Sequence, residues 1–273
     1  MKTIFLVTQL WLSTLAYALS TEESDTLLFA IVPQQSAERL VAGWSPILQL
    51  LSSKTGINLQ FVTAPNIPLF EQRLASGDYD IAYMNPYHFV HFNQTLGFQA
   101  LAHQKDRGIT GVIVTRKDSL INSLSQLAGQ TIAFPAPAAF AATLLPRAEL
   151  KKANILYTAR YVSSHDSVYL GVAKGLFPAG GGVETTLNNT PKEIREQLTI
   201  LWHTDTYTPH AIATHSRVTE TIRTKLQQAL FELDQDPEGR RLLSALNITG
   251  FQSASNDSWN DVKALELNLL SHQ

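Results

Sequence analysis

The chain has 273 residues, a formal net charge of −2 and no cysteine. Lysine and arginine are scattered singly along it, so we expect neither nucleic acid nor an anionic membrane surface as a partner. Without cysteine, the chain can carry neither a disulfide framework nor a lipid-anchored cysteine.

The first 18 residues have the pattern of a cleavable secretory signal. A single early charge, Lys2, precedes an apolar run over residues 4–15 and the small-residue pattern Ala16-Tyr17-Ala18. The run is too short and too early for a membrane span. We therefore expect cleavage after Ala18 and a soluble, monomeric periplasmic protein with no membrane anchor.

Strands and helices alternate in the next part of the chain. Ser36 is placed to cap the first helix, and Gly56 to end it. The expected order is a strand over 26–32, a helix to Gly56, a strand over 57–63, a helix over 68–76 and a strand over 81–84. Such alternation predicts a parallel sheet with helices on its faces.

A second series of the same kind follows. It comprises a strand over 111–115, a helix over 123–128, a strand over 131–134, a helix over 138–153, a strand over 160–163 and a helix over 166–174. A helix over 191–198 precedes an extended return strand, 199–202 with 211–214, and residues 219–270 are expected to be mainly helical. We expect an α/β protein with lobe 1 over 19–112 and 205–273, lobe 2 over 113–204, and a hinge of two crossings.

The strand over 81–84 runs into an aromatic turn that is the most informative segment of the chain. Pro86 stops the strand where Tyr83, Asn85 and Tyr87 crowd together, and strand ends of this kind are where open α/β sheets bind ligands. The two tyrosines could line a cleft or pack in the core. Asn85 could donate to a ligand or simply form the turn.

Two predicted helix starts in the second lobe could hold an anion, because helix N-termini offer free N–H groups and a favourable dipole. One is the segment Ala138-Ala139-Phe140 after the strand over 131–134. The other is Ser163-Ser164-His165, where Asp166 could cap the helix or orient His165. The serines and His165 could donate to a ligand or cap the helix, and Tyr207 could belong to the cleft or to the hinge.

Three segments together resemble the PhnD-type family of periplasmic binding proteins, the phosphate, phosphite and phosphonate receptors of ABC importers. They are 32–36 (VPQQS), 79–87 (YDIAYMNPY) and 163–169 (SSHDSVY). The resemblance implies a type II periplasmic-binding-protein fold, with two α/β lobes that close on a small oxyanion. It also implies an inner-membrane ABC permease as partner.

The resemblance further implies that Tyr83, Tyr87 and His165 contact the ligand. Relatives that bind phosphonates have serine and threonine at the first helix start, where this chain has the hydroxyl-free segment 136–140. Relatives that bind aminophosphonates have an acidic residue at the position that we align with Pro178. Both differences argue against an aminoalkylphosphonate ligand.

Other readings are less well supported by the sequence. Ser164, His165 and Asp166 are adjacent and cannot converge as a catalytic triad, and no nucleophile elbow or dinucleotide fingerprint is present. His88 and His91 lie one helical turn apart, but no carboxylate joins them at ligand spacing. We expect no enzyme activity, metal or cofactor, and the alternative function is a ligand-sensing partner of a membrane sensor kinase.

Overall fold

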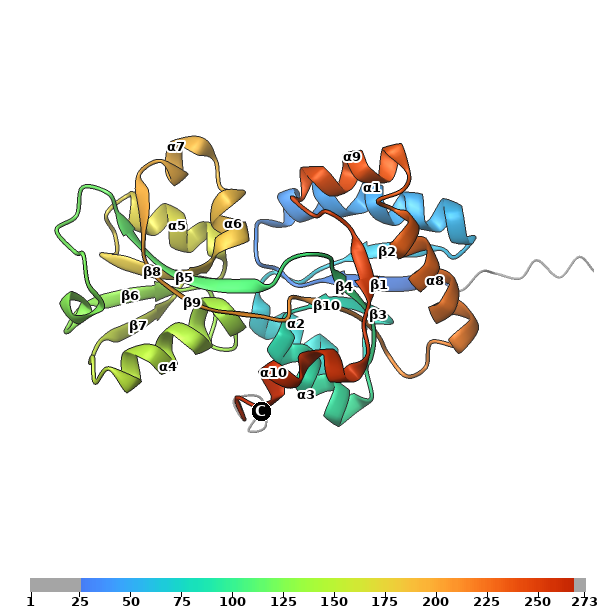
Figure 1. The fold of residues 1–273 in the computed structure, drawn as a ribbon, viewed down its shortest axis with the longest axis horizontal. Coiled ribbons are helices and arrows are strands. Elements are labelled where there is room, and N and C mark those ends of the chain that lie inside the picture. Colours follow the sequence, from blue (N-terminus) through green and yellow to red (C-terminus); the bar gives the residue numbers. More distant parts are fainter. Residues whose placement is uncertain (1–25, 268–273) are drawn as a thin grey trace, which may run out of the picture.

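The computed structural model describes residues 26–267, which form two α/β lobes lying side by side (Figure 1). The signal predicted for residues 1–18 lies outside these residues. Each lobe is built on one sheet, and we name lobe 1 after the six-stranded sheet and lobe 2 after the five-stranded sheet. No helix in the described part of the chain is both long and apolar enough to cross a membrane.

The sheet of lobe 1 has the strand order β11-β4-β10-β3-β1-β2. The parallel strands predicted from the sequence are present at one side, where β1 pairs with both β2 and β3. The return strand β10 is antiparallel to β3 and β4, which makes the sheet mixed. Its strands are β1 (Leu27–Ile31), β2 (Leu59–Val62), β3 (Ile81–Met84), β4 (Gln99–Gln104), β10 (Ala211–Thr214) and β11 (Phe251–Ser253).

Helices cover both faces of this sheet (Figure 1). One face packs against α1 (Ala37–Thr55), α8 (Glu220–Glu232) and α9 (Pro237–Ala245). The other packs against α2 (Ile67–Ala75), α3 (Pro86–Leu96), the short helix η3 (Asn256–Trp259) and α10 (Asn260–Lys263). The predicted ends of α1 are confirmed, since Ser36 accepts from the N–H of Arg39 and Gly56 adopts a left-handed φ of 70°.

The sheet of lobe 2 has the order β7-β6-β8-β5-β9. Its strands are β5 (Ile109–Arg116), β6 (Thr131–Phe134), β7 (Thr158–Tyr161), β8 (Ala179–Val183) and β9 (Leu198–Tyr207). Helix α4 (Leu145–Lys152) covers one face, while α5 (His165–Ala173), α6 (Glu184–Asn188) and α7 (Lys192–Arg195) cover the other (Figure 1). The π-helical turn η2 (Phe140–Leu144) leads directly into α4.

Some predicted elements were wrong in kind. The helix expected over 123–128 is a single 3₁₀ turn, η1 (Leu124–Leu127). The single return strand is two strands in different sheets, β9 in lobe 2 and β10 in lobe 1, because the chain crosses between the lobes at residues 208–210. The other crossing joins β4 to β5, and the expected lobe limits at 112/113 and 204/205 fall inside β5 and β9.

The glycine run Gly180-Gly181-Gly182 is a buried strand, β8, in the middle of the second sheet. A Cβ atom on Gly181 would lie 2.1 Å from the carbonyl oxygen of Ala142, and one on Gly111 of β5 would lie 1.9 Å from that of Ala141. Only glycine permits this approach. The run therefore provides the tight backbone contact between η2 and the sheet.

Candidate functional site

A cavity of about 10 Å³, with room for about one water molecule, lies between the two lobes. Its polar side chains are Gln34, Asn85 and His210 from lobe 1 and His165 from lobe 2. The rest of its lining is apolar: Val32, Ile67, Ile109, Ala139, Phe140, Ala141, Ala142 and Val183. None of the described residues that line this cavity is lysine, arginine, aspartate or glutamate.

Asn85 lies where the aromatic turn begins, and it is both the N-cap of α3 and a contact between the lobes. Its Oδ1 accepts from the N–H of His88 at 2.8 Å, and its Nδ2 donates to the carbonyl of Ala138 at 3.3 Å. The side chain is almost fully buried. The two roles that the sequence left open for Asn85, turn former and donor, are therefore compatible in one side chain.

The first predicted helix start, Ala138 to Phe140, reaches the cavity through its backbone. Ala139 and Phe140 line the cavity, and so do Ala141 and Ala142, which the sequence did not single out. The first N–H groups of a helix have no acceptor within the helix, so this turn offers backbone donors. Its one hydroxyl, on the buried Thr143, does not line the cavity. Small alanine side chains leave the N–H groups accessible.

His165 begins α5 on the opposite wall. Its Nδ1 lies 3.0 Å from the hydroxyl oxygen of Thr186, and its backbone N–H donates to the carbonyl of Gln34 across the cleft at 3.0 Å. Burial lowers the pKa of the His165 imidazole to about 3, so the ring is neutral at physiological pH. It is available as a neutral hydrogen-bonding group.

The serines that precede His165 face away from the cavity. Ser164 is the N-cap of α5, with its Oγ accepting from the N–H of Ser167 at 3.1 Å. Ser163 is exposed and adopts a left-handed φ of 75°. Neither serine lines an inter-lobe cavity in this structure.

The three predicted tyrosines have different surroundings. Tyr83 stacks between Trp44 and His210, with ring centroids 4.7 Å and 5.0 Å away. Tyr87 is buried in the hydrophobic cluster beneath the cleft. Tyr207 packs edge-on against Phe140 at 5.5 Å. Tyr83 lines a second inter-lobe cavity, described next, whereas Tyr87 and Tyr207 line neither.

The second cavity, of about 60 Å³, shares Val32 and Gln34 with the first. Its wall from lobe 1 includes Trp44 and Tyr83, and its wall from lobe 2 is formed by Thr185, Thr186 and Asn189. Pro178, the position aligned with an acidic residue of relatives, does not contribute to it. No carboxylate is present among the described residues that line either cavity.

The sequence left His210 open as a cleft or hinge residue, and it made Gln34 and Gln35 weaker cleft candidates because glutamines in loops usually face solvent. His210 precedes β10 and is only 5% exposed, and the loop that carries it becomes part of the cavity only when the chain returns to lobe 1. Gln34 lines both cavities and Gln35 lines the second. Their position directly after β1, at the carboxyl end of a parallel strand, was the available signal.

His88 has a different environment from the one expected. Its Nε2 lies 2.8 Å from the Glu71 carboxylate of α2, so a carboxylate does approach this histidine, and both side chains are buried. Within residues 26–267, no group of three histidine, cysteine, aspartate or glutamate side chains is arranged to hold a metal ion. The His88–Glu71 pair instead supports the turn that carries Asn85.

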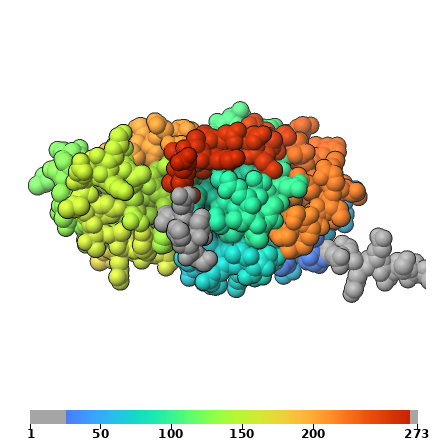
Figure 2. Space-filling view, turned by 90° about the horizontal axis from the view of Figure 1, so that it is seen from below, coloured from blue at the N-terminus to red at the C-terminus, as the bar shows by residue number. Residues whose placement is uncertain are grey.

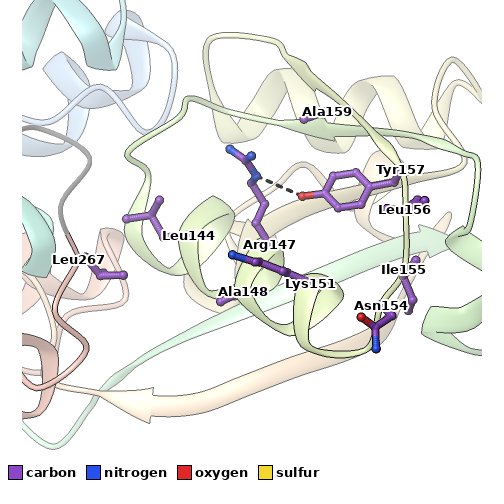
Figure 3. Close-up of a pocket in the computed structure, with 10 residues that line it drawn as sticks. All are labelled: Leu144, Arg147, Ala148, Lys151, Asn154, Ile155, Leu156, Tyr157, Ala159 and Leu267. Carbon is purple, nitrogen blue, oxygen red and sulfur yellow. Dashed lines mark hydrogen bonds between the residues drawn. The ribbon is translucent and has the colours of Figure 1, made fainter. Parts of the chain in front are cut away.

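A much larger groove, of about 780 Å³, lies outside the cleft along α4 (Figure 3). Arg147 and Lys151 line it, and Arg147 is bonded to the hydroxyls of Tyr157 and Tyr161, at 3.1 Å and 2.7 Å. Leu267 of the C-terminal segment reaches it from lobe 1, and that segment runs along lobe 1 to the junction of the lobes (Figure 2). The two inter-lobe cavities bring helix starts and buried donors from both lobes together, so we take them as the candidate ligand site.

Known proteins resemble the chain over most of its length. Residues 29–259 match the family described as ABC transporter, phosphonate, periplasmic substrate-binding protein. A phosphate-import protein PhnD from Mycolicibacterium smegmatis is 23% identical over 226 residues, which cover 74% of this chain and 70% of that protein.

Solved structures share the fold. A binding protein component of an ABC phosphonate transporter from Pseudomonas aeruginosa superposes with a TM-score of 0.82 at 20% identity, covering 88% of this chain and 85% of that one. PhnD1 from Prochlorococcus marinus, in complex with methylphosphonate, gives 0.81 at 18% identity, covering 88% and 96%. The type II periplasmic-binding-protein fold expected from the sequence is confirmed.

Proposed function

The chain belongs to the family of periplasmic substrate-binding proteins of phosphonate ABC transporters, and from this premise we propose that it captures a small phosphorus oxyanion between its lobes. It then delivers that ligand, unchanged, to an inner-membrane permease. It acts as a monomer, exported by a cleavable signal and free of a membrane anchor. The ligand is phosphate, phosphite or a phosphonate with a small neutral substituent.

The observation that carries this proposal is the convergence of donors on one inter-lobe cavity. The η2 turn contributes backbone N–H groups, Asn85 contributes an amide and His165 contributes an imidazole at a helix start. Fixed donors of this kind suit an oxyanion, which accepts several hydrogen bonds at once. Tyr83, lining the adjoining cavity, packs against the ligand's substituent, while Tyr87 and Tyr207 support the cleft from behind.

Lobe closure is the binding step. The cavity of about 10 Å³ has room for about one water molecule but not for a phosphonate, so the lobes must part for the ligand to enter and then close around it. Ligand contacts from both lobes favour the closed form. The permease recognises the closed form and so distinguishes a ligand-bound receptor from an empty one.

Calorimetric titration of the purified mature protein tests the proposal. The ligands are phosphate, phosphite, methylphosphonate, 2-aminoethylphosphonate, sulfate and acetate. We expect binding of at least one of the first three, and weaker binding of 2-aminoethylphosphonate, because no carboxylate is available near its ammonium group. If no phosphorus compound bound at millimolar concentration, the proposal would be overturned. If ³¹P spectra showed that the ligand is consumed, the protein would be an enzyme and not a receptor.

A further inference from the structure

Two histidines from opposite lobes line the same cavity, and one of them has an unused ring nitrogen. His165 comes from α5 of lobe 2, and His210 comes from the crossing that returns to lobe 1. His210 is 5% exposed, and its Nε2 has no hydrogen-bond partner among the described residues. A buried polar atom without a partner is costly, so its presence at a ligand cavity indicates a partner that arrives with the ligand.

One neighbour of the His210 ring, the Tyr83 side chain, suits its cationic form. The ring stacks on Tyr83 with centroids 5.0 Å apart and an angle of 21° between the planes, and Trp44 lies on Tyr83 at 4.7 Å. The face of an aromatic ring attracts a cation placed over it. Contact with the face of Tyr83 therefore stabilises the cationic form of the His210 ring more than the neutral form.

The charges that face His210 are few. The nearest titratable groups are the imidazoles of His165 on α5 and His88 on α3. Glu71 on α2 is paired with His88, and Tyr83 on β3 faces the ring as a neutral phenol. Burial and the two neighbouring imidazoles lower the pKa of His210 to about 3, so it is neutral in this structure. An oxyanion in the cavity would be the nearest full charge, and its negative charge would raise the pKa of His210.

We propose that His210 takes up a proton at Nε2 when an oxyanion enters the cavity, so that the protein captures the anion and a proton together. The proton comes from water or buffer, and no other bond is made or broken. The resulting imidazolium donates to the oxyanion and supplies the positive charge that the described lining of the cavity otherwise lacks. This inference rests on the proposed function and specifies how the same site neutralises its ligand.

Calorimetry with methylphosphonate measures this uptake. Titrations at pH 7.5 in two buffers of low and high ionisation enthalpy give the number of protons bound per ligand, for the wild type, His210→Gln and the matched control His203→Gln, whose side chain is exposed on β9. The protonation state of bound methylphosphonate is read from the ³¹P shift of each complex, so that any proton taken up by the ligand itself can be subtracted. We expect the wild type and the control to take up at least half a proton more than His210→Gln; equal uptake in all three proteins would overturn the inference.

The wild type alone provides an independent measurement if His210→Gln folds or binds poorly. The ¹⁵N spectrum of histidine-labelled protein is recorded with and without saturating methylphosphonate. One imidazole should change from the neutral to the doubly protonated pattern, and unchanged ring signals in the saturated protein would overturn the inference while leaving the receptor function intact. Failure of every phosphorus oxyanion to bind would instead overturn the proposed function itself, and the inference with it.

Discussion

Arg39 in the first turn of α1 and Asp166 in the first turn of α5 form an ion pair between the two lobes, with 3.1 Å between Nη1 and Oδ1. Asp166 also accepts from the N–H of Ser36 at 3.2 Å, and Arg39 donates to the carbonyl of Asn189. The sequence suggested that Asp166 caps α5 or orients His165. The structure instead gives the cap to Ser164 and makes Asp166 part of a latch on the closed form.

Replacing Asp166 with asparagine should weaken ligand binding by favouring the open form. The variant keeps an acceptor for the N–H of Ser36 but loses the charge that faces Arg39. Because both side chains are partly exposed, the pair is worth at most about 1 kcal/mol, or about fivefold in affinity. Small-angle scattering should show a larger ligand-free molecule than the wild type, and an unchanged radius of gyration would contradict the latch. Glu238→Gln, which removes an ion pair within α9, is the matched control.

Replacing His165 with alanine should reduce affinity for the oxyanion by about 10- to 100-fold, the loss expected for one hydrogen bond to a charged group. The protein should still unfold cooperatively. Ser164→Ala provides the contrast, because loss of the N-cap should lower the free energy of unfolding by about 1 kcal/mol and leave affinity nearly unchanged. Titration calorimetry and denaturant unfolding of both variants separate these roles. If His165→Ala bound normally, His165 would be structural.

Asn85 allows its two roles to be separated by a pair of substitutions. Asn85→Asp keeps the oxygen that caps α3 but replaces the Nδ2 donor with a negative charge beside the anion site, so binding should be lost. Because the new carboxylate faces the Ala138 carbonyl, stability should also fall. Asn85→Ala removes the cap without adding a charge, so it should cost about 1 kcal/mol of stability and weaken binding less. Normal affinity in Asn85→Asp would exclude Asn85 from the ligand site.

The close contact between β8 and η2 can be tested with Gly181→Ala. The new Cβ atom would meet the Ala142 carbonyl oxygen at 2.1 Å and the Phe134 ring at 2.7 Å, so η2 must shift. We expect a loss of about 1–3 kcal/mol in stability together with weaker binding. Gly171→Ala in α5, which meets only the Phe177 ring at 2.9 Å, should be milder on both counts. Equal effects of the two changes would show that η2 tolerates displacement.

Acid should destabilise the ligand-free protein through its buried histidines. The pKa values of His165 and His210 are lowered to about 3 in the folded state, whereas in the unfolded chain they are ordinary, near 6.5. Between these values only the unfolded state binds the protons, so stability is full above about pH 6.5 and falls as the pH is lowered. The slope is up to about 1.4 kcal/mol per pH unit for each histidine.

Denaturant unfolding at pH 7.5, 6.5 and 5.5 checks this prediction. The double variant with His165→Gln and His210→Gln should have a shallower pH dependence than the wild type, since other titrating groups contribute equally to both. Parallel profiles would contradict it. With an oxyanion bound, the trend should weaken or reverse, because the anion opposes the effect of burial on these rings.

Periodic and capping signals predicted much of the fold. Ser36 and Gly56 delimit α1 through local hydrogen bonding and a left-handed turn, and the strand over 131–134 agrees with β6 to the residue. The glycine run over 180–182 gives no strand signal in the sequence, because glycine has no side chain that could show an alternating apolar pattern. These glycines are required by the close contact between β8 and η2, which only the structure shows. Likewise, the residues of β9 and β10 read as one strand because nothing local records that the chain changes sheets between them.

The sequence by itself determined the alternation of elements, the caps that begin and end helices, and the segments whose strand ends and helix starts could hold an anion. These depend on neighbours within about four residues, so they can be read along the chain. Only the tertiary structure decided which candidates meet. It brought Asn85, His165 and His210 to one cavity from positions 45 to 125 residues apart, turned Ser163 and Ser164 away and paired Asp166 with Arg39. Such convergence depends on lobe closure and on strand order, neither of which local sequence encodes.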